Sequence, residues 1–259
     1  MSNNDSHLQI ADVGAKVDGK TISQWSQEWL KWAFHQPASH PAAAPLGTFT
    51  APALPANAAV DNHPPVFFLY GGDWPNSTVP SIPTIDIKDG NAVLIPVVNV
   101  FDIESGDNNI ASIPEFVAEG RGTYADEARY VAHLAADQIS DAFLTISKNG
   151  RTLVNLHPDD LKKYSVETGT FALGNPQTSP LDYIGDVLTN FGVSLNQHDF
   201  KFTDEIGQWA MITGLQKGDY TVHFGAHIGA VVDTSPVTGK VTTILSAVIH
   251  DTTEVLHVG

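Results

Sequence analysis

Short runs of β-branched, aromatic and aliphatic residues recur through most of this chain, and turn-forming residues separate them. The clearest runs cover residues 66–70, 92–101, 142–146, 151–154, 170–173, 208–212, 220–224, 241–249 and 254–258. The gaps hold Gly, Pro, Asp and Asn, and Asn149-Gly150 is a strong signal for a β-hairpin. Because these strands do not alternate regularly with helices, the pattern argues against a doubly wound fold. We therefore expect a mainly β protein, built as a β-sandwich or jelly roll.

A Trp-rich helix is expected near the N-terminus. Thr21 and Gln24 fit a capping box, and three tryptophans follow at helical spacing, Trp25, Trp29 and Trp32. Such a stripe can bury a large apolar area, so we expect the helix to dock on a sheet. The alternative is an aromatic platform for a ligand.

The chain is long enough for one large domain. It has 259 residues, of which 42% are hydrophobic, and this is enough to build a core. We expect a single domain over residues 21–259 with one inserted helix near residues 124–140, preceded by an N-terminal arm or strand over residues 1–20. The Pro-rich segment 37–65 is expected to run extended over the surface.

The charge and the cysteine content exclude several classes of function. With 13 Lys and Arg against 29 Asp and Glu, the net charge of −16 repels polyanions and argues against nucleic acid. The absence of cysteine excludes disulfides, thiolate zinc sites, iron–sulfur clusters and a Cys nucleophile. No apolar run is long enough for a membrane span, so no membrane insertion is expected.

The location expected from composition is extracellular or on the cell surface. The first residues show neither the basic nor the apolar region of a Sec-type signal. Acidic chains without cysteine are common among proteins that are exported through a C-terminal signal, and this association favours export. A cytoplasmic location and a secreted chain whose signal has already been removed are the alternatives.

An acidic stretch follows the strand expected over residues 92–101. It brings carboxylate and amide oxygens close together in sequence, at Asp102, Glu104, Asp107, Asn108 and Asn109. Calcium takes about six to eight oxygen ligands, often from one flexible loop, and Gly106 permits a tight turn. We predict a calcium site here, although the spacing is not that of an EF-hand. A solvated acidic turn is the alternative.

Motifs for catalysis are missing from the sequence. There is no Gly-x-Ser-x-Gly or Ser-x-x-Lys motif, and no phosphate-binding loop of the Walker or Rossmann type. We therefore predict no catalytic residue. Carboxylates from distant strands could still converge as in a glycosidase, and the candidates are Asp102, Glu104, Asp204 and Glu205.

A Gly-hinged loop follows the strand expected over residues 66–70. It carries Tyr70, Asp73 and Trp74, a combination that suits stacking on a sugar ring together with hydrogen bonding. These residues are the candidates for binding a glycan. Packing of Trp74 over the end of the fold is the alternative.

Four stretches of the chain together resemble a known group of proteins. They are the Trp-rich opening, the strands 66–70 and 94–99, the hairpin 148–156 and the closing segment 209–224. In these stretches the chain resembles uncharacterised bacterial, mostly secreted β-sandwich proteins with a Trp-rich N-terminal helix. The resemblance implies a β-sandwich over about residues 21–258, and it brings no catalytic residues with it.

The function expected from these features is that of a non-catalytic extracellular or cell-surface protein that binds or self-assembles, with calcium as a stabilising ion. A carboxylate- or metal-dependent hydrolase and a carbohydrate-binding module are the alternatives. Leu8, Ile10, Val13 and Val17 make the first residues a strand without a nearby hairpin partner. This segment either pairs within its own sheet or joins a neighbouring copy, which would build a homo-oligomer or filament.

Overall fold

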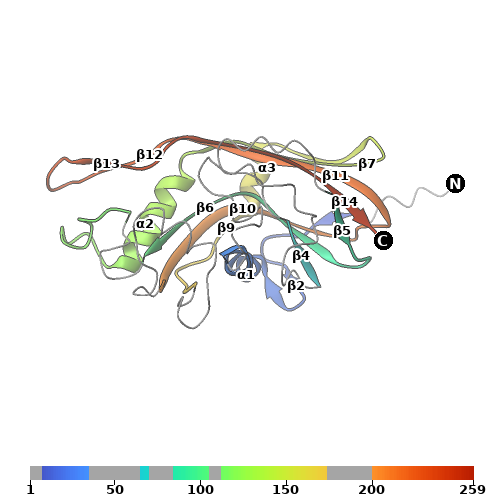
Figure 1. The fold of residues 1–259 in the computed structure, drawn as a ribbon, viewed down its shortest axis with the longest axis horizontal. Coiled ribbons are helices and arrows are strands. Elements are labelled where there is room, and N and C mark those ends of the chain that lie inside the picture. Colours follow the sequence, from blue (N-terminus) through green and yellow to red (C-terminus); the bar gives the residue numbers. More distant parts are fainter. Residues whose placement is uncertain (1–7, 35–64, 70–83, 105–111, 174–199) are drawn as a thin grey trace.

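The chain folds into a mainly β structure. The computed structural model describes residues 8–34, 65–69, 84–104, 112–173 and 200–259. These residues form two five-stranded sheets, two two-stranded sheets, three α-helices and a single-turn 3₁₀ helix (Figure 1). The mainly β class expected from the sequence is therefore confirmed.

The first sheet is built around one long antiparallel pair. Its strands are β1 (Gln9–Ile10), β10 (Phe202–Thr213), β6 (Ala92–Glu104), β4 (Val66–Phe68) and β9 (Ser165–Glu167). β6 and β10 pair along most of their length, with a bulge between Gln208 and Trp209. β1 pairs with the last two residues of β10, and β9 pairs with residues 206–208 in its middle. β4 runs parallel to the start of β6, from Ala92 to Leu94. Beyond Leu94 this edge of β6 has no strand partner among the described residues.

The second sheet contains β5 (Thr84–Ile87), β14 (Val248–Val258), β11 (Gly218–Ile228), β7 (Ile139–Lys148) and β8 (Arg151–Leu156), in that order. All pairs are antiparallel except β5 with β14. Between β7 and β8, Asn149 and Gly150 have φ values of 52° and 74°, which is the left-handed conformation of a type I′ turn. The predicted hairpin is thus confirmed.

The two sheets lie over each other, and α1 (Ile22–Phe34) lies on the outer side of the first sheet (Figure 1). One large hydrophobic cluster contains side chains from both sheets. A second cluster joins α1 to the first sheet. In it Trp25, Trp29 and Trp32 are at most 8% exposed, so the predicted docking of the Trp helix is confirmed.

Both predicted helix starts have a capping box. The Thr21 N–H donates to Gln24 Oε1 at 2.9 Å, and the Gln24 N–H donates to Thr21 Oγ1 at 3.2 Å. α2 (Tyr124–Ala136) begins in the same way with Thr123 and Asp126. A short α3 (Pro158–Leu161) is followed by the 3₁₀ helix (Lys162–Tyr164). No helix in the described ranges has the length and apolar character that crossing a membrane requires.

The strand expected over residues 170–173 is only an isolated bridge between Phe171 and Thr203, and two further predicted boundaries are wrong. The second helix ends at Ala136 rather than near residue 140, because Ile139 already pairs with Ile228 in the second sheet. The expected strand 241–249 is divided into β13 (Val241–Leu245) and the start of β14. β13 does not continue the sheet, since it pairs with β12 (Val231–Thr234) in a separate two-stranded sheet. A further two-stranded sheet joins β2 (Lys16–Val17) to β3 (Lys20–Thr21).

The β12–β13 pair is joined to α2 and to the segment before it through the buried carboxylate of Asp233. Arg121 donates from both terminal nitrogens to the carboxylate of Asp233, each at 2.8 Å, and Tyr130 Oη donates to the same carboxylate at 2.9 Å. Ile244 of β13 packs with Val131 of α2 in a third hydrophobic cluster. This anchoring places β12 and β13 beside the end of β6.

Candidate functional site

A pocket of about 230 Å³ lies along the edge of β6 that has no strand partner in the described structure. Its walls come from β6, α1, α2 and the strands β11 to β14, and most of the lining is apolar. Four polar side chains interrupt this lining, and they belong to Asn99, Asp102, Ser112 and His250. No Lys or Arg is among the described residues that line it.

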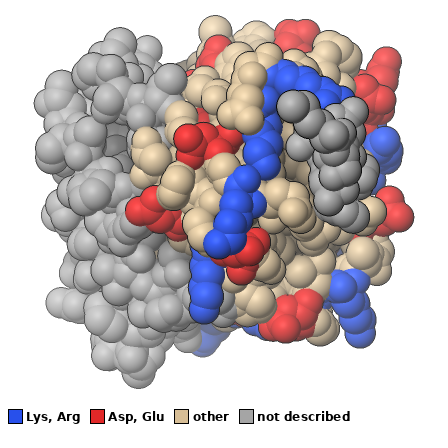
Figure 2. Space-filling model, turned by 90° about the vertical axis from the view of Figure 1, so that its right-hand side faces the viewer, with Lys and Arg blue, Asp and Glu red and all other residues tan. Residues whose placement is uncertain are grey.

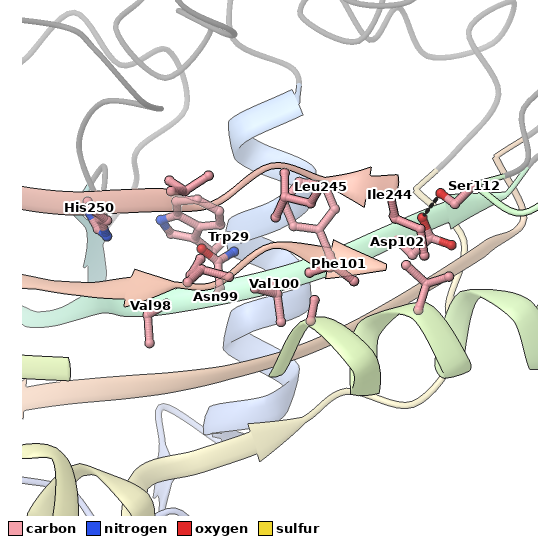
Figure 3. Close-up of a pocket in the computed structure, with 15 residues that line it drawn as sticks. Trp29, Val98, Asn99, Val100, Phe101, Asp102, Ser112, Ile244, Leu245 and His250 are labelled. Atoms are coloured by element: carbon pink, nitrogen blue, oxygen red, sulfur yellow. Dashed lines mark hydrogen bonds between the residues drawn. The ribbon is translucent and has the colours of Figure 1, made fainter. Parts of the chain in front are cut away.

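Consecutive residues of β6 reach the pocket because it follows the strand edge. In Figure 3, Val98 and Val100 leave β6 on one side, whereas Asn99 and Phe101 leave it on the other. Trp29 of α1 closes the pocket on the side of Asn99. Among the described residues β4 pairs only with 92–94 of β6, and the pocket lies along the part of β6 beyond this pairing.

Three buried carboxyl groups meet where β6 ends. Asp102 and Glu104 come from β6 and Glu127 from the first turn of α2, and all three are at most 7% exposed. Ser112 Oγ donates to Asp102 Oδ1 at 2.5 Å, and the Ser112 N–H donates to Glu104 Oε1 at 3.0 Å. The Ile113 N–H donates to Glu127 Oε1 at 2.7 Å. We call Asp102, Glu104 and Glu127 the carboxyl cluster.

Each member of the carboxyl cluster keeps one buried oxygen without a hydrogen-bond donor when all three are ionised. Glu104 lies within hydrogen-bonding reach of both Asp102 and Glu127, so a shared proton satisfies two such oxygens at once. Burial raises the pKa of Asp102 to about 6 and that of Glu127 to about 7. It raises the pKa of Glu104 further, and repulsion from the other two carboxylates adds to the effect. The cluster therefore holds protons at pH values where exposed carboxyl groups are ionised.

The carboxylates expected on β10 lie at the same end of the sheet but on opposite faces. Asp204 is the ladder partner of Asp102, so both face α2, and Arg129 Nε of that helix lies 3.7 Å from Asp204 Oδ2. Glu205 faces α1, where Asn99 Nδ2 donates to its Oε1 at 3.1 Å. Of the four candidates for a glycosidase-like pair, Asp102 lines the pocket, whereas Glu104, Asp204 and Glu205 do not.

The structure describes only part of the predicted calcium site. Asp102 and Glu104 do come together, but Asp107, Asn108 and Asn109 lie outside the described residues. In the parts of the chain that are described, no group of three or more His, Asp or Glu side chains is arranged to hold a metal ion. Calcium binding stays a prediction.

The predicted glycan-binding residues Tyr70, Asp73 and Trp74 also lie outside the described residues, as does most of the Pro-rich segment 37–65. Glycan binding therefore stays a prediction too. β1 pairs with β10 of the same chain, which is the first of the two arrangements expected for the N-terminal segment. This single chain does not test self-assembly.

Sequence reasoning missed Glu127, Ser112 and His250 as site residues. Glu127 lies in the first turn of α2, where the helix dipole alone favours a carboxylate. The signal that could have found it is its spacing, because it lies four residues before the buried Val131 and therefore on the same face of α2. Ser112 and His250 carry no comparable local signal.

Comparisons with known proteins do not assign the chain to a family. No family model, no curated protein and no solved structure matches it. The resemblance to secreted bacterial β-sandwich proteins thus stays an expectation.

Proposed function

We propose that this chain is a non-catalytic binding protein of the β-sandwich class, and that the pocket beside β6 holds a small, mainly apolar ligand. The observation that carries the proposal is the composition of the pocket. Eleven of its fifteen described lining residues are apolar, and four polar side chains lie among them. Pockets of this composition are typical of small-molecule sites, where apolar walls supply affinity and a few polar groups orient the ligand.

The size of the pocket indicates the size of the ligand. A cavity of about 150 Å³ lined by Leu, Ile and Phe is large enough for benzene. A volume of about 230 Å³ therefore suits one aromatic ring with a short substituent. The sandwich class is supported by the hydrophobic cluster to which both large sheets contribute.

Binding is favoured over hydrolysis by the number of carboxyl groups in the pocket. Glycoside hydrolysis uses two carboxyl groups on either side of the scissile bond, whereas Asp102 is the one carboxyl among the described lining residues. The extracellular location, calcium stabilisation, glycan binding and self-assembly remain parts of the proposal that rest on the sequence.

The test is binding of a neutral aromatic probe, indole, measured by calorimetry and by ligand-observed NMR. Ala135 lines the pocket from α2, so Ala135→Leu should fill part of the volume and abolish binding. Ala125→Leu is the matched control, because Ala125 lies on the same helix but does not line the pocket. Thermal melting checks that both variants fold. A wild-type protein that does not bind indole, or an Ala135→Leu variant that binds it equally well, would contradict the proposal.

A further inference from the structure

One carboxyl group is among the described lining residues of the pocket, and two more lie behind it. Asp102 lines the pocket, and Glu104 and Glu127 lie directly behind it. Asp102 is 7% exposed, and apart from a proton shared with Glu104 its Oδ2 atom has no donor in the described structure. The one titratable base in the described lining is His250, whose Nε2 lies 3.1 Å from Thr252 Oγ1.

Cations of the protein do not neutralise the carboxyl cluster. In the described part of the chain, Asp102, Glu104 and Glu127 form no ion pair with Lys or Arg. Arg121 lowers the pKa of Glu127 from a distance, but its guanidinium is committed to Asp233 at 2.8 Å. Figure 2 shows Lys and Arg in a line across the right-hand side of the view in Figure 1, whereas β6 ends beside α2 at the left.

A buried carboxylate without a paired cation is costly, and a cation that enters from outside relieves this cost. A metal ion is the poorer candidate, because the described residues offer no group of three ligands for it. An organic ammonium group needs one carboxylate, and its apolar remainder suits the Val and Ile walls. Trp29 and Phe101 also line the pocket and add aromatic surface, which attracts cations.

We propose that the ligand of this pocket is an apolar amine, whose ammonium group lies against Asp102 and whose ring or alkyl group fills the apolar part. This inference rests on the proposed function, because it assigns a ligand class to the same pocket. It predicts that the pocket discriminates by charge between ligands of equal shape.

The experiment compares three probes that share a phenyl group: 2-phenylethylamine, 2-phenylethanol and 3-phenylpropanoate. Binding to the 259-residue protein is measured by calorimetry at pH 7.5. The amine should bind at least about tenfold more tightly than the alcohol, and the carboxylate should bind more weakly than both. Asp102→Asn should bring the affinities for the amine and the alcohol within about twofold of each other.

The matched control is Asp141→Asn, which removes the same charge from an exposed site outside the pocket. Asp141 has a φ of 53°, a conformation that Asn adopts readily, so this variant should fold and keep the preference for the amine. If both variants lost the preference for the amine to the same extent, net charge rather than Asp102 would be its cause. Should Asp102→Asn fail to fold, Glu127→Gln takes its place, with a smaller loss of preference expected.

The outcomes separate this inference from the function on which it rests. Equal binding of amine and alcohol to the wild-type protein would overturn the amine assignment and leave the apolar pocket in place. Failure of all three probes to bind would contradict the binding function itself.

Discussion

Replacing Glu205 with Gln should stabilise the protein at neutral pH and change its stability little near pH 4. Glu205 is fully buried on β10 under α1. Asn99 Nδ2 donates to Oε1 at 3.1 Å, and Oε2 has no donor in the described structure. Burial raises the pKa of Glu205 well above its usual value of 4.5, and the charge of Asp204 adds to this, while hydrogen bonds from Asn99 and Ser26 oppose it.

The direction in which stability changes with pH follows from the number of protons that the folded and the unfolded state bind. Above pH 4.5 the unfolded chain releases the proton of Glu205, whereas the folded protein keeps it. The free energy of unfolding therefore falls as the pH rises, by about 1.4 kcal/mol per pH unit for one group, until the pH reaches the folded pKa. Gln has the shape of a protonated Glu and does not titrate. The stability difference between Glu205→Gln and wild type should thus grow by about 1.4 kcal/mol per unit above pH 5 and then level off.

The assay is urea unfolding of both proteins at pH 5, 6 and 7, followed by Trp fluorescence. Glu28→Gln is the control, because the Glu28 side chain on α1 is 42% exposed and its ion pairs with Lys20 and Lys31 are 3.7 Å and 3.9 Å long. Exposed pairs of this kind contribute about 0–1 kcal/mol, so this variant should differ little from wild type. A difference between Glu205→Gln and wild type that stays constant with pH would refute the reasoning. So would a Glu205→Gln protein that is less stable than wild type at pH 7.

Four further predictions concern packing, an ion pair, calcium and assembly. Trp29→Ala should lower the free energy of unfolding in urea by about 3–5 kcal/mol, since it removes a buried ring and the hydrogen bond from Nε1 to the Leu69 carbonyl. A variant with wild-type stability that has lost ligand binding would support the aromatic platform instead. Arg121→Met leaves the buried Asp233 without its ion-pair partner and should lower the free energy of unfolding by about 3–5 kcal/mol. An unchanged midpoint of urea unfolding would contradict this. Calcium at a hundredfold excess over its Kd should stabilise the protein by about 2.7 kcal/mol, and equal melting temperatures in calcium and EGTA would count against the site. Deleting residues 1–18 should abolish any self-assembly seen by light scattering. Assembly that survives the deletion would show that the N-terminal segment does not link the copies, and so would a protein that is monomeric at high concentration with calcium.

The sequence by itself determined the features that depend on neighbouring residues. The hairpin at Asn149 and Gly150 follows from two residues that adopt positive φ easily. The start of α1 follows from the side chains of Thr21 and Gln24, which satisfy free N–H groups of the first turn. The docking of α1 follows from the spacing of its tryptophans, because a stripe of large apolar side chains must leave water.

Tertiary structure decided where the elements end and which side chains meet. The helical spacing continues to Ile139, but pairing with Ile228 in the second sheet ends α2 at Ala136. Glu127 reaches Asp102 because α2 packs against β6, and no local pattern encodes the distance between residues so far apart in sequence. The pocket likewise lies along the part of β6 beyond its described pairing with β4, and side chains from six other elements line it. Such sites depend on pairing and packing between distant segments, and short-range preferences carry no information about them.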